Sequence, residues 1–163
     1  MAPVPRHPPP PSHIVGWREW VALPDLGLLG VEAKVDTGAE FAVLHAVDLE
    51  RFRDGGGPHV RFETHPLQGD LRTVVACVAA VVGERAITSS NGQTETRLAI
   101  ETTLRLGPQI DAPSWPVLVT LTDRRVMQFR LLLGRASLGG RVLVDPAASY
   151  LQGRIPDARV LYG

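Results

Sequence analysis

The sequence has little cysteine, no net charge and no long apolar run. A single cysteine, Cys77, among 163 residues excludes an internal disulfide. Lysine plus arginine and aspartate plus glutamate both number 17, so no overall field draws the chain to nucleic acid or to a membrane. No stretch approaches the roughly 18 consecutive apolar residues of a membrane span. Without a secretory signal or a disulfide framework, we expect a cytoplasmic protein.

Proline and glycine, in contrast, are abundant, with 14 and 16 copies. Four consecutive prolines, Pro8 to Pro11, favour extended polyproline II and supply no hydrogen-bond donors. We therefore expect residues 1–12 to form a disordered tail. Residues 13–163 are long enough for one domain with a single core and short for two.

Segments rich in valine, leucine, isoleucine and threonine lie between the glycines and prolines, as is typical of strands. The pair Asn91-Gly92 between two such runs predicts a hairpin, because both residue types tolerate positive φ. Short helices are predicted over residues 46–52 and from Arg135. The sequence thus indicates a mainly β fold, with strands over residues 14–23, 30–35, 59–64, 72–82, 85–89, 95–106, 115–121, 129–133 and 142–144.

Asp36-Thr37-Gly38 follows the apolar-leaning strand at residues 31–35, so its carboxylate lies where a strand opens into a glycine turn. The Thr37 hydroxyl can lock neighbouring backbone, and Gly38 lets a backbone N–H approach the carboxylate closely, which favours the charged form. Two carboxylates about 3 Å apart share one proton and can activate water for amide hydrolysis. The chain carries one such turn, so the second carboxylate must come from another copy.

A later segment, Leu131-Leu132-Leu133-Gly134, is an apolar strand ending in glycine before a short helix. Together with Asp36-Thr37-Gly38, it resembles the retropepsin-like aspartic peptidases. This resemblance implies the closed β-barrel of half an acid protease, in which the two segments interlock in a ψ-shaped motif. It also implies a flap hairpin, here residues 85–97 with its tip at 89–93, and a homodimer that shares two aspartates.

A narrower resemblance is to a bacterial family historically labelled ATP-dependent zinc proteases, whose members are retropepsin-like. Some members are associated with ATP-grasp ligases that add glutamates to proteins, and the peptidase trims such tails. The resemblance implies a peptide or protein substrate and no cofactor. It is carried by blocks in the family's order, at residues 15–21, 34–39, 44–46, 89–93, 129–135 and 144–146.

The sequence departs from this family just after the aspartate, where Glu40 and Phe41 stand in place of a usual basic residue and its neighbour. Glu40 counts against an acidic substrate, and Phe41 makes the adjoining pocket more apolar. By analogy with retroviral relatives, we predict an ion pair between Glu40 and Arg135.

The predicted site has two parts. Asp36, Thr37 and Gly38 are assigned to catalysis. The residues assigned to substrate binding come from the turn, the strand that follows it and the hairpin tip, and they are Ala39, Glu40, His45, Ser90, Asn91 and Gly92.

Two other functions stay open, a metal-dependent hydrolase and a non-catalytic binding domain with a retropepsin fold. His7 and His13 lie in or next to the tail, and the other three histidines, at 45, 59 and 65, have no recognised metal-ligand spacing, so no metal is expected. Arg124 and Arg125 are interpreted as solvated turn charges, whereas Lys34, Arg97 and Arg130 are candidates to face a cleft. No interleaving of basic and aromatic residues indicates nucleic-acid binding.

Overall fold

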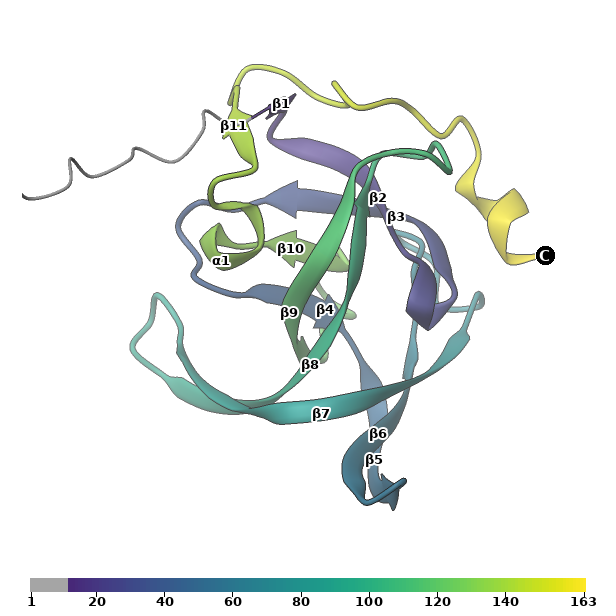
Figure 1. Ribbon diagram of the computed structural model, residues 1–163, viewed down its shortest axis with the longest axis vertical. Helices are drawn as coiled ribbons and strands as arrows, with labels where there is room; N and C mark the ends of the chain where they lie inside the picture. The colour runs from purple at the N-terminus through teal and green to yellow at the C-terminus, as the bar shows by residue number, and fades with distance from the viewer. Residues whose placement is uncertain (1–11) are drawn as a thin grey trace, which may run out of the picture.

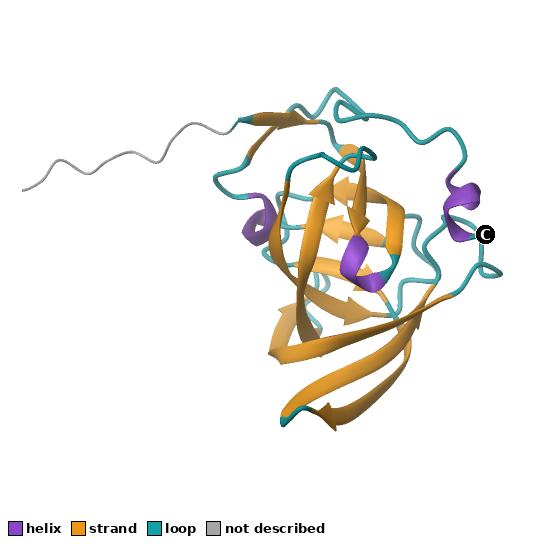
Figure 2. Cartoon of the chain, turned by 45° about the vertical axis from the view of Figure 1, so that its right-hand side comes forward, coloured by secondary structure: helices purple, strands orange, loops and turns teal. Residues whose placement is uncertain are grey.

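A computed structural model describes residues 12–163, which form a mainly β domain (Figures 1 and 2). All but the last residue of the predicted tail, 1–12, lie outside the described part. The strands are β1 (His13–Val15), β2 (Arg18–Leu23), β3 (Leu28–Val35), β4 (Ala42–His45), β5 (Val47–Asp54), β6 (Gly57–Thr64), β7 (Val75–Thr88), β8 (Thr94–Leu106), β9 (Ser114–Thr122), β10 (Leu131–Leu133) and β11 (Val142–Val144).

Six strands close into a barrel. The order β2-β3-β10-β4-β9-β8 runs around the ring, and β8 pairs again with β2 to complete it. The interior is filled by apolar side chains such as Val31, Leu44, Ile100 and Leu131, each at most 1% exposed. Burying such side chains stabilises the fold by about 1.5–3 kcal/mol each. Closure leaves these six strands no free edge between them, as the resemblance implied.

β10 lies between β3 and β4, which come from the first third of the chain. It runs parallel to β3, with Leu131 opposite Ala33, and antiparallel to β4, with Leu131 opposite Leu44. The connection from β3 to β4 carries Asp36, and β10 leads into α1 (Arg135–Leu138). The predicted interlocking of the two segments is therefore confirmed, as is the short helix.

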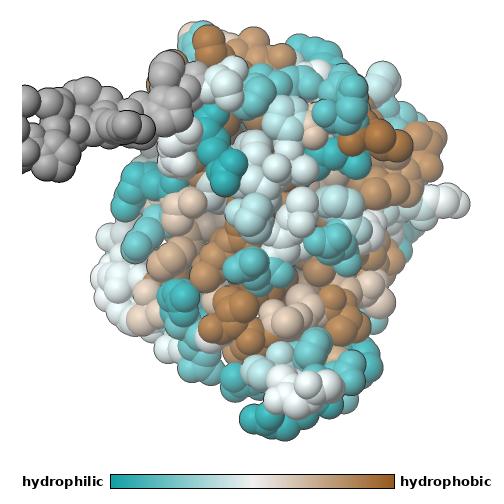
Figure 3. Space-filling model, viewed as in Figure 1, coloured by the Kyte–Doolittle hydropathy of each residue, from teal (hydrophilic) through white to brown (hydrophobic). Residues whose placement is uncertain are grey.

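β7, β6 and β5 extend the sheet beyond the barrel, and β5 with β6 forms a projecting hairpin (Figure 1). The outer side of β7 exposes Val78 and Val82 by about half, at 49% and 47%. Figure 3 shows apolar residues gathered on this lower part of the face. The far end of β7 continues with β8 as the predicted hairpin, which the register Thr88 opposite Thr94 confirms.

The helix predicted over residues 46–52 is wrong, because β5 occupies that segment. Gly55 and Gly56 take positive φ, 59° and 84°, and fold the chain back so that Arg51 lies opposite Val60. This local turn outweighs weak helical periodicity. Two predicted strands, 72–82 and 85–89, are the single strand β7, which continues through a bulge at Gly83.

The predicted strand 14–23 is divided into β1 and β2 at Gly16. A Cβ at Gly16 would lie 2.2 Å from the Ala148 carbonyl oxygen, so the backbone of the C-terminal segment passes close against it. The remaining helices, η1 (Pro24–Leu26) and η2 (Ala158–Tyr162), are single turns. Within residues 12–163, no helix has the length and apolarity needed to cross a membrane.

Candidate active site

The Asp36 carboxylate is held by its own turn. The Gly38 N–H donates to Asp36 Oδ1 at 3.0 Å, and the Asp36 N–H donates to the Leu133 carbonyl at 2.9 Å. A Cβ at position 38 would lie only 3.2 Å from Oδ1, so glycine allows this approach. Asp36 is partly buried, and one of its oxygens is thus fixed by backbone while the side chain still reaches the surface.

The start of α1 clamps the other side of the turn. The Arg135 N–H donates to the Ala39 carbonyl and the Ala136 N–H to the Glu40 carbonyl, both at 2.8 Å. A Cβ at Gly134 would lie 2.6 Å from the Phe41 carbonyl oxygen, so a side chain at this position would force the two segments apart. Close backbone contact therefore explains the glycine that ends the Leu-Leu-Leu-Gly segment.

The predicted ion pair between Glu40 and Arg135 is wrong. Arg135 Nη1 donates instead to the Thr37 carbonyl at 2.9 Å, and no pairing with Glu40 occurs within residues 12–163. The backbone bonds of α1 place Arg135 against Thr37, and the Glu40 side chain stays in solvent. The Thr37 hydroxyl makes no hydrogen bond within the described chain, so this residue fixes the turn through its carbonyl.

Asp36 opens into a pocket of about 530 Å³ between the turn and the β7–β8 hairpin. Five predicted site residues line it, namely Asp36, Gly38, Ala39, Glu40 and Ser90. The other lining residues come from β4, β7, β8, β10 and nearby loops, and they are Phe41, Val43, Ala86, Ile87, Thr88, Arg97, Arg124, Leu132 and Arg135. Thr37, His45, Asn91 and Gly92 are not among the lining residues.

The tip of the β7–β8 hairpin is held by local bonds. Gly92 donates to the Ser89 carbonyl at 2.9 Å, and Ser89 donates to the Gln93 carbonyl at 2.8 Å. Gly92 has a φ of 84°, whereas Asn91 keeps a negative φ and accepts the Gln93 N–H through its side chain. The whole tip is exposed. Of its predicted substrate-binding residues, Ser90 faces the pocket directly.

Three arginines bring positive charge to the pocket. Arg135 is bonded to the Asp36 turn, and the other two are Arg97 and Arg124. Arg97 had been a candidate for this role, whereas the interpretation of Arg124 as a solvated charge is wrong. Burial lowers the pKa of Arg124, and the charge of Asp36 opposes that shift. The Nε atoms of Arg97 and Arg124 donate to Glu95 and to the Phe129 carbonyl. The terminal nitrogens of these two arginines have no protein partner in the described chain. Lys34 and Arg130, the other candidates, do not line the pocket.

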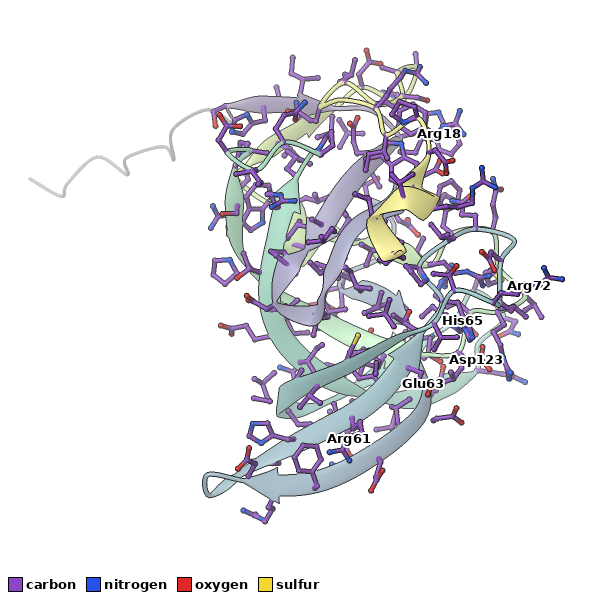
Figure 4. All side chains as sticks on the ribbon, turned by 90° about the vertical axis from the view of Figure 1, so that its right-hand side faces the viewer. Arg18, Arg61, Glu63, His65, Arg72 and Asp123 are labelled. Carbon is purple, nitrogen blue, oxygen red and sulfur yellow. The ribbon has the colours of Figure 1, made fainter. Side chains whose placement is uncertain are left out.

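His45 is fully buried behind the pocket and stacks on His65. Its Nε2 lies 2.7 Å from His65 Nδ1, and its Nδ1 accepts the Arg124 N–H at 2.8 Å. Burial, followed by the charge of Arg130, lowers the pKa of His45 to about 4. Figure 4 shows His65 and Asp123 on the same side of the molecule, where β6 leaves the barrel. His45 was predicted to bind substrate, but its side chain is fully buried and is not among the residues that line the pocket.

Both ring nitrogens of His45 are already engaged, which leaves none for a metal. Within residues 12–163, no three His, Cys, Asp or Glu side chains are grouped as metal ligands would be. Asp36 and Glu40 are the two carboxylates among the residues that line the pocket.

Residues 14–155 match the family described as RimB-like, retropepsin-like aspartic endopeptidase RimB. A "Probable alpha-L-glutamate ligase" of Shewanella pealeana is 41% identical over 92% of this chain, and one of Parasynechococcus marenigrum is 43% identical over 86%. The matches cover 32% and 29% of those proteins, so the chain spans about a third of the length of the curated relatives it matches.

Among solved structures, the crystal structure of a Legionella pneumophila protein of unknown function is similar. The TM-score is 0.70 at 28% identity, and the match covers 86% of this chain and 98% of that one. The likeness therefore extends over nearly all of the other molecule.

Proposed function

Because the chain belongs to the RimB-like family of retropepsin-like aspartic endopeptidases, we propose that it hydrolyses peptide bonds with Asp36 as its catalytic carboxylate. The observation that carries this proposal is the fixed Asp36 carboxylate at a pocket that Arg97, Arg124 and Arg135 also line. The Gly38 N–H donates to the carboxylate itself, and the Thr37 carbonyl accepts from Arg135, which fixes the turn that carries the carboxylate. The domain that does this work comprises residues 13–163.

A second copy of the chain would complete the site. Amide hydrolysis in this way needs two carboxylates that share a proton, and a two-fold axis beside Asp36 would bring the partner copy's equivalent carboxylate next to it. The ionised carboxylate takes a proton from water as the water oxygen attacks the carbonyl carbon, and the protonated one donates to the carbonyl oxygen. The C–N bond then breaks as the carboxyl group that took the proton from water gives it to the leaving amine. A hydroxyl of the tetrahedral intermediate returns its proton to the other carboxylate as the carbonyl forms again.

We propose that the substrate is an acidic peptide. Arg97 pairs with Glu95 and Arg124 with the Phe129 carbonyl through Nε alone, so within residues 12–163 their terminal nitrogens remain available for a substrate carboxylate, which arginine can bind with two parallel hydrogen bonds. The names of the relatives point the same way, since a glutamate ligase makes bonds of the kind that such a peptidase would cut. Glu40 lines the same pocket, but its side chain extends into solvent. The positive charge of Arg97 and Arg124 therefore exceeds the negative charge that Glu40 brings to the pocket.

The β7–β8 hairpin would act as a flap over the bound peptide. Ser90 lines the pocket, and Asn91 and Gly92 form the exposed tip that would move when a peptide enters. An extended peptide could add its backbone hydrogen bonds to those of the hairpin. We place the activity in the cytoplasm, in keeping with the free thiol of Cys77.

The test is cleavage of an internally quenched oligo-L-glutamate peptide, with an oligoglutamine peptide of equal length as control. We expect cleavage of the glutamate peptide and a loss of about a thousandfold or more in Asp36→Asn, the size of a lost general acid–base group. Glu40→Gln is the matched control, because Glu40 is the pocket's other carboxylate. Full activity in Asp36→Asn would end the proposal.

Whether two copies share the pair of aspartates is tested by mixing wild-type and Asp36→Asn subunits. An excess of Asp36→Asn subunits should inhibit the wild-type protein by forming mixed dimers with one carboxylate, while the same excess of a non-dimerising protein should not. Light scattering should give the mass of a dimer. Peptide binding without cleavage by the wild type would favour the non-catalytic alternative, and activity lost on chelation would favour the metal-dependent one.

A further inference from the structure

The backbone of Arg124 is held from both sides by buried side chains. Its N–H donates to His45 Nδ1 at 2.8 Å, and its carbonyl accepts from Arg130 Nη1 at 3.1 Å. His45 is 0% and Arg130 2% exposed. Arg124 follows β9 in a loop between β9 and β10, so nothing in regular secondary structure fixes it there. The side chains of His45 and Arg130 supply backbone hydrogen bonds that a neighbouring strand would otherwise make.

The hydrogen-bond directions determine the form of His45. Since Nδ1 accepts the Arg124 N–H, the proton of the neutral ring is on Nε2, which donates to His65 Nδ1. His45 itself is fixed at its backbone, where its N–H donates to the Arg130 carbonyl at 2.7 Å and its carbonyl accepts from the Thr64 hydroxyl at 2.6 Å. His65 therefore keeps His45 in the one tautomer that can accept from Arg124.

We propose that His45 is a positioning residue, which holds the Arg124 backbone so that the Arg124 side chain is placed in the Asp36 pocket to bind a substrate carboxylate. The inference rests on the proposed function, since it gives Arg124 a substrate to bind. It explains how a fully buried histidine nine residues after Asp36 can influence the site without touching it. It also assigns His65 the role of fixing the tautomer.

Protonation of His45 would break the link. With both ring nitrogens carrying protons, Nδ1 becomes a donor and faces the Arg124 N–H, another donor. The Asp123 carboxylate, 3.7 Å from Nδ1, would attract the new proton. The charged groups that act on the ring are Asp123, Arg125 and Arg130, and His65 lies at Nε2. Acid should therefore release the Arg124 loop before the barrel unfolds.

Two variants separate the two bonds of the ring. In His45→Asn the side-chain oxygen can take the place of Nδ1 and accept from Arg124, although the bond to His65 is lost. In His45→Gln the longer amide reaches the place of Nε2 and can bond His65, but the Arg124 N–H loses its acceptor. If the proposal is right, Asn preserves the function of the loop and Gln does not.

The first measurement is hydrogen exchange of the Arg124 amide by NMR in the full-length chain, which needs no substrate. We expect about tenfold faster exchange in His45→Gln than in the wild type or His45→Asn, the equivalent of one lost hydrogen bond. In the wild type, the same amide should lose protection at acid pH. This measurement needs no variant, so it still tests the proposal if either substituted protein does not fold. Equal protection in the wild type, Gln and Asn proteins would overturn the proposal.

The second measurement is kinetic, with the glutamate peptide described above. His45→Gln should raise KM about tenfold with little change in kcat, Arg124→Met should do the same, and the double variant should lose no more than either alone. If the changes in KM add in the double variant, or if His45→Asn raises KM as much as His45→Gln, then His45 has only a structural role. Should the wild type cleave no peptide, the proposed function fails, while the exchange measurement still decides the His45–Arg124 link.

Discussion

The Asp36 turn and the β7–β8 hairpin tip face the same pocket but are held in different ways. The turn is bonded to segments far along the chain, as in the Arg135 to Thr37 contact between residues 98 positions apart. The tip is bonded only within itself, through Ser89, Gly92 and Gln93. A Cβ at Gly134 would meet backbone at 2.6 Å, whereas one at Gly92 would meet nothing within 4 Å.

This difference divides the pocket into a fixed half and a half that can move. The carboxylate must be held to a few tenths of an ångström to activate water, so its position depends on the packing of the whole barrel. A cover over the substrate must open and close, so its tip is best stabilised by contacts that move with it. Substitutions that change one half and not the other would test this division.

The largest effect is expected from Gly134→Ala. The added Cβ would lie 2.6 Å from the Phe41 carbonyl oxygen, with no flexible side chain to give way, so the turn and α1 must separate. We expect a loss of about 3 kcal/mol or more in the free energy of unfolding, measured by urea denaturation. Gly57→Ala is the control, because its Cβ would meet only the Asp54 oxygen at 3.9 Å. Similar losses in the two variants would mean that the Asp36 turn is not tightly clamped.

The next largest effect is expected from acid, which should lower the free energy of unfolding through His45, the residue that holds Arg124 at the pocket. The pKa of His45 in the folded protein is about 4, against 6.5 for the free side chain, so the unfolded chain binds its proton more readily. This contribution to stability is complete above about pH 6.5 and is lost as the pH falls to 4, by about 3 kcal/mol. Urea denaturation at several pH values should show it, and His45→Asn should flatten the curve between these limits. The hairpin, residues 85–97, contains no histidine, so its own opening should not respond over this range.

A smaller effect is expected from Arg135→Met, which removes the donor to the Thr37 carbonyl. One charged donor to a carbonyl contributes about 1.5 kcal/mol, and this one connects distant parts of the turn. Arg53→Met is the control, because Arg53 donates to the Gly56 carbonyl at 3.3 Å within one local turn, and it should cost a few tenths of a kcal/mol. Thermal melts of both variants give the comparison. If the two lose equal stability, the long-range contact has no special weight.

Local sequence patterns predicted much of this architecture. Val142–Val144 matches a predicted strand, and Glu95–Leu106 begins one residue from the observed β8, because alternating apolar residues and flanking glycines mark both. The turn at Asp36 was predictable from its own short pattern, whereas its pairing with Leu131–Gly134 was predicted from the resemblance to retropepsin-like peptidases. Where prediction failed, at residues 46–52, two glycines beyond the segment decided between helix and strand.

The pocket was harder to predict, because its charged side chains are placed by contacts from distant segments. Arg124 follows β9 in a loop with several polar residues, which normally lies in solvent. Hydrogen bonds to the buried His45 and Arg130 and to the Phe129 carbonyl hold it at the pocket instead. His45 lies 79 residues away, and Arg130, although only six residues away, is not related to Arg124 by any sequence pattern. The predicted ion pair between Glu40 and Arg135 was wrong for a different reason. They were paired by analogy, but the backbone of α1 directs the guanidinium to Thr37.

The smallest change in stability and the most selective change in function are expected from Gly92→Ala at the hairpin tip. Gly92 has a φ of 84°, where a Cβ costs about 1 kcal/mol, and the space around it is open. Gly69 offers a matched control, because it has a φ of 68° with nothing within 4 Å and does not line the pocket. Both alanine variants should lose about the same stability, yet only Gly92→Ala should change KM for the glutamate peptide, by about threefold to tenfold. A KM that moves equally in both, or in neither, would show that the tip does not cover the substrate.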